Sequence, residues 1–374
     1  MLFALDFIVL AVNTQNRNNA VLFIRLDLIG DFIAWTGAAL ELSKYYHNQK
    51  RVLLVNDDLY DLSCKLGYWD EIWPVNRNKF GSNPIYRLRI LYKVRSYGFN
   101  IVINPRREFR ITDSIVRISN APQRIGANGS ETFRELKWEN KFSNRWYTKI
   151  INLTPRFESS VFQHGYLFCK GIGINVENIP IAFIPPYVDE RIFYPDFPLS
   201  SYYVLFVGAS DPIRMWPPEK FAEISRRIWM EFKIQGIICG GSSDIATSEK
   251  VLTLSYPRSV INLAGKTNLL QLIGIIRHAR LCISNETSAI HISASTACPS
   301  ICILGGGDFG YFMPYPKIPE NQNYSQPIAI YKTMSCYRCT WRCIYPRIEN
   351  RCAPCIAEIS VEDVWGAVID SRTL

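Results

Sequence analysis

Two aspartates follow an apolar run near the start of the chain. The run at residues 21–25 leads into the motif RLDLIGD at residues 25–31. A carboxylate can accept a proton from an attacking hydroxyl group that lies within hydrogen-bond reach. Asp31 could equally be the N-cap of a following helix. The motif lacks the Gly-x-Gly-x-x-Gly pattern of a dinucleotide site. We therefore treat Asp27 and Asp31 as candidates for proton transfer.

Two segments further along the chain have the residue types of a phosphate site. In GASDPIRMWPPE (residues 208–219) the prolines and the glutamate mark a helix start, which places Arg214 in the loop before it. A guanidinium there can pair bidentately with phosphate oxygens, although a surface arginine is the plain alternative. In SNETSAIH (residues 284–291) a second helix start would offer free N–H groups beside the hydroxyls of Thr287 and Ser288.

Three other residues in or near these segments have less specific interpretations. Glu286 conflicts with a phosphate unless its carboxylate faces sugar hydroxyls. His291 is interpreted as a structural histidine rather than a catalyst. Gly306, within the glycine run at residues 305–307, would allow a ligand to approach the main chain, and a plain loop would explain it nearly as well.

Five of the eleven cysteines fall near the end of the chain, within residues 336–355. The pairs Cys336-x2-Cys339 and Cys352-x2-Cys355 have the spacing of a tetrathiolate zinc or iron site, and Cys343 adds a fifth thiol. We expect such a metal to be structural, because four thiolates leave no open position for a substrate.

Apolar runs alternate with helix-length segments along most of the chain, which predicts an α/β fold with helices on both faces of parallel sheets. The expected strands lie at residues 21–25, 52–56, 71–75 and 100–104 in the first half and at 202–207, 236–239, 280–284 and 300–304 in the second. A first helix is expected from about residue 32 to 46. Prolines at residues 180–198 predict a linker with a boundary near residue 195.

The expected domains are residues 1–195, residues 196–355 with the cysteine-rich segment 336–355, and a final helix within 356–374 that begins at Ser360. No membrane-spanning helix is expected, because the apolar start at residues 1–12 is short and interrupted by Asp6. We expect the protein to be cytoplasmic, with reduced thiols.

The 374-residue chain has a net charge of +9, and its basic excess is concentrated. Residues 77–149 contain 16 basic and five acidic residues. Such a region attracts phosphorylated substrates, anionic membranes or nucleic acid, or it is simply a solvated face. The charge alone does not choose among these.

Four motifs in order carry a family resemblance: RLDLIGD, RMWPPE (residues 214–219), NLAGKT (262–267) and NETSAIH (285–291). From about Val21 to its end, the chain resembles glycosyltransferase family 9, which contains the ADP-heptose:lipopolysaccharide heptosyltransferases. The resemblance implies a GT-B fold of two facing Rossmann-like domains. The N-terminal domain would bind the acceptor and the C-terminal domain the nucleotide sugar, with inverting transfer and no catalytic metal.

The resemblance also implies roles for individual residues. Asp31 matches the general base, and Arg214 matches a basic residue that contacts the donor diphosphate. The Glu286–Ser288 stretch matches a donor-binding Asp-Thr-Gly, with Glu in place of Asp and Ser in place of Gly, so its contacts are expected to differ. Gly306 is assigned to the same donor site. The acceptor domain would use Asp27, Arg106 and Arg107.

The function expected from the resemblance is transfer of heptose from ADP-heptose to a hydroxyl of an anionic glycan or glycolipid such as lipopolysaccharide core. Peripheral contact with the inner face of the membrane is expected, and nucleic acid is not. Family members often use a cysteine set that matches Cys336, Cys339, Cys343 and Cys355, and protein-glycosylating relatives hold iron with it. The alternatives are a protein heptosyltransferase, a sugar-nucleotide epimerase and a non-catalytic glycan-assembly protein.

Overall fold

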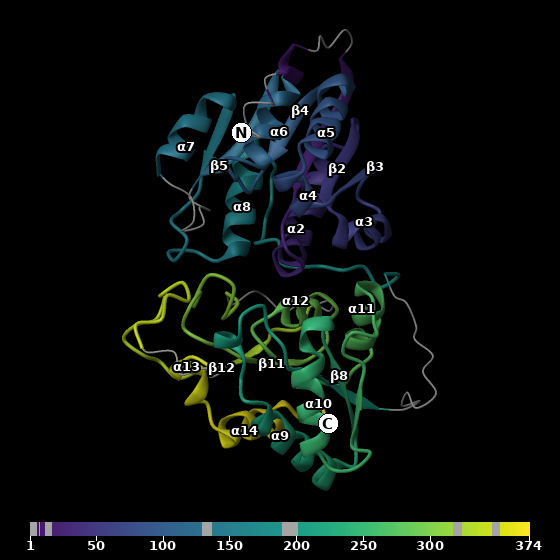
Figure 1. Cartoon of the computed structure of the whole chain (residues 1–374), viewed down its shortest axis with the longest axis vertical. Coiled ribbons are helices and arrows are strands. Elements are labelled where there is room, and N and C mark those ends of the chain that lie inside the picture. The colour runs from purple at the N-terminus through teal and green to yellow at the C-terminus, as the bar shows by residue number, and fades with distance from the viewer. Residues whose placement is uncertain are drawn as a thin grey trace. The chain divides into compact units, whose positions relative to one another are not determined.

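The computed structural model describes residues 6, 8–11, 17–128, 137–188, 201–316, 324–345 and 352–374. The chain divides into two compact units, Met1–Ile181 and Ala182–Leu374 (Figure 1). Among the described residues, no helix combines the length and the apolar composition needed to cross a bilayer. The α/β class predicted from the sequence is confirmed.

The first unit contains a parallel sheet with the strand order β3-β2-β1-β4-β5-β6. Its described strands are β1 (Asn18–Arg25), β2 (Lys50–Asn56), β3 (Glu71–Val75), β4 (Phe99–Asn104), β5 (Gln123–Asn128) and β6 (Lys149–Asn152). Its described α-helices are α2 (Ile29–Tyr45), α3 (Tyr60–Leu66), α4 (Arg77–Ser82), α5 (Pro84–Tyr97), α6 (Thr112–Ser119), α7 (Lys137–Ser143) and α8 (Val161–Ile172). In a sheet of this order, ligands bind beyond the carboxyl ends of the strands where the order reverses, which is between β1 and β4.

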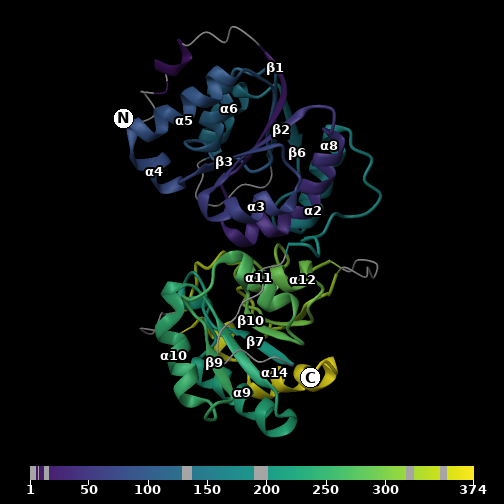
Figure 2. The same cartoon turned by 90° about the vertical axis from the view of Figure 1, so that its right-hand side faces the viewer.

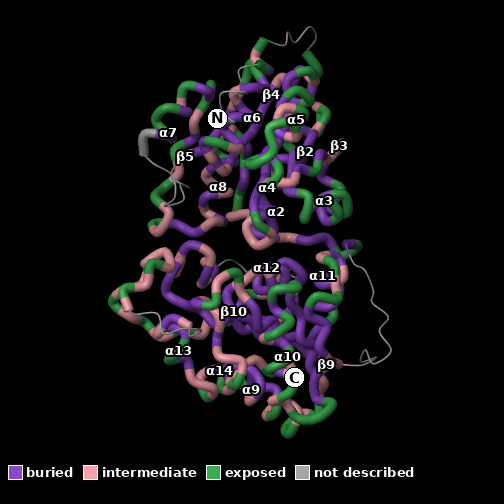
Figure 3. Tube along the Cα trace, in the orientation of Figure 1, coloured by how far each residue is buried: buried purple, intermediate pink, exposed green. Residues whose placement is uncertain are grey.

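Helices cover both faces of this sheet, with α4, α5 and α6 on one side and α2 and α8 on the other (Figure 2). Alternate residues of β1 show the consequence. Leu22 and Ile24 lie in one core cluster with Leu91 of α5. Phe23 points to the opposite face, where its ring centre lies 4.7 Å from that of Trp69. Both faces are buried (Figure 3), so the strands are apolar at consecutive positions instead of alternate ones.

The second unit repeats this arrangement with the order β12-β11-β10-β7-β8-β9. Its described strands are β7 (Tyr202–Phe206), β8 (Gln235–Cys239), β9 (Val260–Asn262), β10 (Cys282–Asn285), β11 (Ser300–Ile303) and β12 (Ile328–Ile330). Its described α-helices are α9 (Pro218–Phe232), α10 (Ile245–Leu254), α11 (Leu269–Arg277), α12 (Ser288–Ser295), α13 (Pro354–Ala357) and α14 (Val361–Ser371). Here the order reverses between β7 and β10.

The core of the second unit explains why its last helix belongs to it. Leu205 of β7, Ile224 of α9 and Val364 of α14 lie in one buried cluster. Trp216, just before α9, is fully buried, and its indole Nε1 donates to the main-chain oxygen of Ile359 at 3.0 Å. The helix predicted to begin at Ser360 is found, and the Ser360 side chain caps it. It is part of the second unit's packing.

The two units divide after Ile181, earlier than the boundary predicted near residue 195, which itself lies outside the described residues. The chain already contacts the second unit before that point. The Ile184 N–H donates to the Ser295 carbonyl at 3.2 Å, and Arg277 Nη2 donates to the carbonyl of Pro185 at 3.0 Å. The prolines therefore belong in part to the second unit instead of forming only a linker.

Candidate functional site

The first candidate site lies where the strand order of the first sheet reverses. β1 ends at Arg25 and β4 ends at Asn104, and the two strands are parallel neighbours. Asp27 and Arg106 each follow one of them by two residues, so the backbone brings them to the same edge of the sheet. This is the edge at which doubly wound sheets bind their ligands.

Asp31 lies on helix α2, which begins earlier than predicted. The helix starts at Ile29, with Leu28 in the N-cap position, so the predicted start near residue 32 was late. The N-cap alternative for Asp31 was wrong, since Asp31 lies in the first turn of the helix. Its carboxylate is thus available for contacts with residues beyond the helix.

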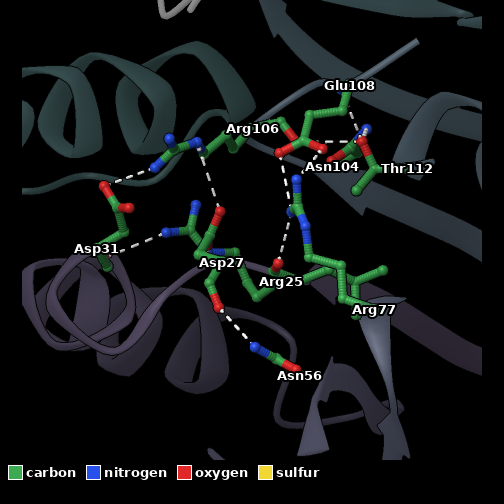
Figure 4. Close-up of polar contacts among 10 residues, drawn as sticks. Arg25, Asp27, Asp31, Asn56, Arg77, Asn104, Arg106, Glu108 and Thr112 are labelled. Carbon is green, nitrogen blue, oxygen red and sulfur yellow. Dashed lines mark hydrogen bonds and ion pairs between the residues drawn. The ribbon is translucent and has the colours of Figure 1, made fainter. Parts of the chain in front are cut away.

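Two arginines contact the two aspartates (Figure 4). Arg106 Nη1 lies 2.5 Å from Asp31 Oδ1, and Arg106 Nε lies 3.5 Å from Asp27 Oδ1. Arg25 Nε lies 2.5 Å from Asp27 Oδ2, and Arg25 Nη2 donates to the main-chain oxygen of Asp31 at 3.3 Å. The structure therefore brings together three of the predicted site residues, Asp27, Asp31 and Arg106.

Opposing effects act on the pKa of Asp31. Burial alone would raise the pKa of this carboxyl group. The charge and hydrogen bond of Arg106, with the charges of Arg25 and Arg156, outweigh burial and hold the pKa below its ordinary value. Asp31 is consequently ionised at neutral pH, as a proton acceptor must be.

A second ion pair, which was not predicted from the sequence, holds the loop after β1 in place. Arg77 donates to both carboxylate oxygens of Glu108 at 3.0 and 2.7 Å and to the main-chain oxygen of Leu26 at 2.8 Å. Asn56 Nδ2 donates to the main-chain oxygen of Asp27 at 3.3 Å. Asn56 ends β2 and Arg77 follows β3, so position at the carboxyl ends of strands was the signal that could have found them.

Arg107 has different surroundings from Arg106. It is buried, its Nη2 donates to Ser143 Oγ at 2.6 Å, and the same nitrogen lies 3.4 Å from Asp113 Oδ2. Its guanidinium also lies 4.5 Å from the ring centre of Tyr147. None of these contacts of Arg107 is with Asp27 or Asp31, and its acceptor role stays a prediction.

The second candidate site lies at the corresponding place in the second sheet, between β7 and β10. Asn285 ends β10 and joins the two strand ends. Its Nδ2 donates to the Val207 carbonyl at 2.8 Å, and its Oδ1 accepts from the Trp216 N–H at 2.9 Å. Asn285 therefore fixes the loop that carries Arg214, a role that was not predicted from the sequence.

Arg214 lies against Glu286 and Trp341. Its Nη2 donates to the Glu286 main-chain oxygen at 2.8 Å, and the Glu286 carboxylate lies 3.6 Å away. The guanidinium carbon lies 5.0 Å from the ring centre of Trp341. Arg214 is partly exposed, whereas the side chain of Glu286 is only 4% exposed. Two predicted donor-site residues thus contact each other directly.

Thr287 and Ser288 form the start of helix α12. Thr287 is the N-cap, and its hydroxyl accepts from the Ala289 N–H at 3.3 Å. Its Oγ1 also lies 3.1 Å from Ser284 Oγ. Ser288 is the first helical residue. The predicted helix start is confirmed, and it follows β10 at the edge where the sheet order reverses.

The glycines at 305–307 pack against the cysteine-rich segment. A Cβ atom on Gly306 would overlap Tyr337, and one on Gly307 would overlap Trp341. The Gly306 N–H donates to Cys355 Sγ at 3.4 Å, and its carbonyl accepts from the Arg338 N–H at 2.7 Å. The close approach that these glycines allow is made by side chains of the protein itself. Donor contact at Gly306 stays a prediction.

Four cysteines line one cavity: Cys336, Cys339, Cys343 and Cys355. Burial raises the pKa of Cys339 and of Cys355. Cys352 is not among the lining residues and packs against the core of the second unit. Over the described ranges, no group of three or more His, Cys, Asp or Glu side chains is arranged to hold a metal ion. The metal stays a prediction, and so does the choice between Cys343 and Cys352 as the fourth ligand.

His291 has the structural surroundings expected for it. Its Nδ1 lies 2.5 Å from the Tyr315 hydroxyl, the two rings stack, and the side chain is buried.

Comparison with known proteins identifies the family of the chain. The model described as "Glycosyltransferase family 9 (heptosyltransferase)" matches residues 87–336. Lipopolysaccharide core heptosyltransferase OpsX from Haemophilus influenzae is 22% identical over 83% of this chain and 84% of that protein. Lipopolysaccharide heptosyltransferase 3 from Escherichia coli is 26% identical over 32% of this chain. That match spans 35% of the relative's length.

Two solved structures share the fold. Heptosyltransferase WaaC from E. coli, solved with ADP-2-deoxy-2-fluoro heptose, has a TM-score of 0.67 at 16% identity, over 94% of this chain and 100% of that chain. The iron-containing dodecameric glycosyltransferase TibC from enterotoxigenic E. coli has a TM-score of 0.54 at 13% identity, over 96% and 77%. The predicted GT-B fold is confirmed. Since the family model matches more than half of the sequence, the chain belongs to glycosyltransferase family 9 and is a heptosyltransferase-like glycosyltransferase.

Proposed function

We propose that the protein transfers heptose from ADP-heptose to a hydroxyl group of an anionic glycan of the lipopolysaccharide core type. The observation that carries the proposal is the ion pair of Asp31 with Arg106 at the edge of the first sheet where the strand order reverses. OpsX is a lipopolysaccharide core heptosyltransferase, and WaaC was solved with ADP-2-deoxy-2-fluoro heptose, which supports this donor and acceptor class.

In the proposed reaction, Asp31 takes the proton of the acceptor hydroxyl as its oxygen attacks the anomeric carbon. The new C–O bond forms on the face opposite the diphosphate, and the bond from the anomeric carbon to the diphosphate oxygen breaks. ADP leaves with that electron pair, so the sugar configuration inverts. Exclusion of water from the site would protect the donor from hydrolysis.

Arg214 and the start of α12 are proposed to hold the donor diphosphate. The Arg214 guanidinium and the N–H groups near Thr287 and Ser288 would stabilise the negative charge that develops on the leaving group. These groups supply positive charge where other transferases use a metal ion, which is why we propose a metal-independent reaction. Glu286 is proposed to orient Arg214 and to face the sugar hydroxyls.

The acceptor is proposed to bind the first unit at Asp27, Arg106 and Arg107. The acceptor's negative charge would suit the basic excess in residues 77–149. An anionic glycolipid would place the protein at the inner face of the membrane, by peripheral contact. We expect no role for nucleic acid.

The cysteine-rich segment is proposed to hold a structural zinc or iron ion. Four thiols on one cavity wall have the donor chemistry for either metal. TibC, which shares the fold, is an iron-containing glycosyltransferase, and this supports the assignment. The metal would hold the segment's fold and would take no part in the transfer.

A thermal-shift screen tests the proposed donor. The purified protein is heated with ADP-heptose, with UDP-, GDP- and dTDP-sugars and with the free nucleotides. A donor at 100 times its dissociation constant stabilises a protein by about 2.7 kcal/mol. We expect a shift with ADP-heptose that is lost in Arg214→Ala, whereas a shift with another sugar nucleotide alone would contradict the ADP-heptose assignment.

A further inference from the structure

The carboxylate that the proposed mechanism needs is occupied by a protein side chain. Among the residues that the structure describes, Arg106 is the only side chain at ion-pair distance from Asp31, at 2.5 Å. The side chains of Asp31 and Arg106 are 15% and 24% exposed, so both reach the surface of the site. This ion pair makes the carboxylate a weaker base, so its replacement would make Asp31 a stronger base toward an acceptor hydroxyl.

The pairing around Arg106 is arranged so that its movement would uncover Asp31 and leave the other charges paired (Figure 4). Asp27 keeps its contact with Arg25 at 2.5 Å. Glu108 keeps both of its hydrogen bonds from Arg77. Arg106 reaches Asp27 only at 3.5 Å, by a single atom pair.

An anionic group on the acceptor would replace Asp31 as the partner of Arg106. A guanidinium binds carboxylate and phosphate oxygens with the same geometry with which it binds an aspartate. We propose that Arg106 is a positioning residue that keeps Asp31 paired until a carboxylate or phosphate of the acceptor binds the guanidinium. This inference rests on the proposed function, since it assumes that Asp31 is the base.

The exchange gives the acceptor control of the reaction. With the acceptor bound, Arg106 pairs with its oxyanion, and Asp31 takes the proton of the hydroxyl that attacks the anomeric carbon. Without the acceptor, water is the only nucleophile present, and Asp31 stays paired and is a weaker base toward it. The donor is thereby protected from hydrolysis by a mechanism additional to the exclusion of water.

The test measures release of ADP from ADP-heptose without acceptor, in wild-type protein and in Arg106→Gln and Arg106→Lys. General-base assistance is worth about 100- to 10,000-fold, so freeing Asp31 even partly should raise hydrolysis by Arg106→Gln roughly tenfold or more. Arg106→Lys keeps the charge but not the guanidinium geometry and should raise hydrolysis less than Arg106→Gln does. Arg226→Gln is the matched control, because Arg226 forms a 2.5 Å ion pair with Glu223 on the exposed side of α9.

Two further readouts separate this role from a structural one. Loss of the Arg106 charge raises the pKa of Asp31, so the acidic limb of the pH–rate profile should move to higher pH in Arg106→Gln. The KM for deacylated lipopolysaccharide core should rise in the same variant. The inference is overturned if Arg106→Gln, folded as judged by its melting temperature, shows unchanged hydrolysis and an unchanged acidic limb. Absence of transfer by the wild type would instead contradict the proposed function.

Discussion

The guanidinium of Arg214 lies 5.0 Å from the ring centre of Trp341. Trp341 belongs to the cysteine-rich segment, and its Nε1 donates to Asp308 Oδ2 at 3.1 Å. Arg338, Thr340 and Trp341 all have positive φ angles, which are uncommon for residues other than glycine. This strained segment therefore positions an aromatic ring over the arginine proposed to bind the donor.

Replacing Trp341 with alanine should weaken donor binding. The ring-to-guanidinium contact is worth about 0.5–2 kcal/mol, so losing the positioned arginine should raise the dissociation constant by at most roughly 30-fold. Trp341→Phe keeps an aromatic face and should bind close to wild type. Isothermal titration with ADP measures both variants. Wild-type affinity in a folded Trp341→Ala protein would show that the ring does not position Arg214.

Replacing Arg107 should destabilise the first unit. Arg107 is buried beside the fully buried Asp113, and removal of one partner from a buried ion pair costs about 3–5 kcal/mol. Arg107→Ala should lower the urea midpoint strongly. Arg106→Gln, whose arginine is partly exposed, should lower it little. Unchanged stability in Arg107→Ala, with a raised acceptor KM, would instead support the predicted acceptor contact.

Asp363 should give α14 a pH-dependent stability. Hydrogen bonds from Ser360, then from Lys332, lower the pKa of Asp363 to about 2. A depressed pKa stabilises the folded state above the ordinary value of 3.8, and this contribution is lost as the pH falls through about 2. Asp363 is the N3 residue of the capping box, and Asp363→Asn should cost about 1 kcal/mol of unfolding free energy at neutral pH.

Urea unfolding of wild type and Asp363→Asn at several pH values checks this prediction. The difference between them should be constant at neutral pH and should shrink below pH 3.8. Asp370→Asn removes an exposed carboxylate from the same helix and serves as the control. A difference that grew on acidification would contradict the assigned sign.

The sequence predicted the elements that continuous apolar runs mark. Each predicted strand is present, with small shifts at its ends, because strands buried on both faces are apolar throughout. The strands β5, β6, β9 and β12 were missed. Each is short or carries polar residues, such as Arg124 in β5, whose Nε donates to the Trp146 carbonyl at 2.6 Å. Tertiary contacts of that kind leave no local pattern.

The candidate site was predicted in part. Asp27, Asp31 and Arg214 were found because they follow strands in recognisable motifs. Their partners were harder to predict. The pairing of Arg106 with Asp31 joins the ends of β1 and β4, which are far apart in the sequence. The neighbours of Gly306 were also not foreseeable, because Tyr337 lies in a segment whose path the sequence does not specify.

The transfer assay with Asp31→Asn is the most direct test of the account. ADP-heptose and lipopolysaccharide core are incubated with each protein, and the heptosylated product is followed by mass spectrometry. Asparagine keeps the size of the side chain and cannot take the proton, so kcat should fall about 100- to 10,000-fold while the affinity for ADP-heptose stays at the wild-type value. Transfer by Asp31→Asn at the wild-type rate would contradict the assignment of Asp31 as the base.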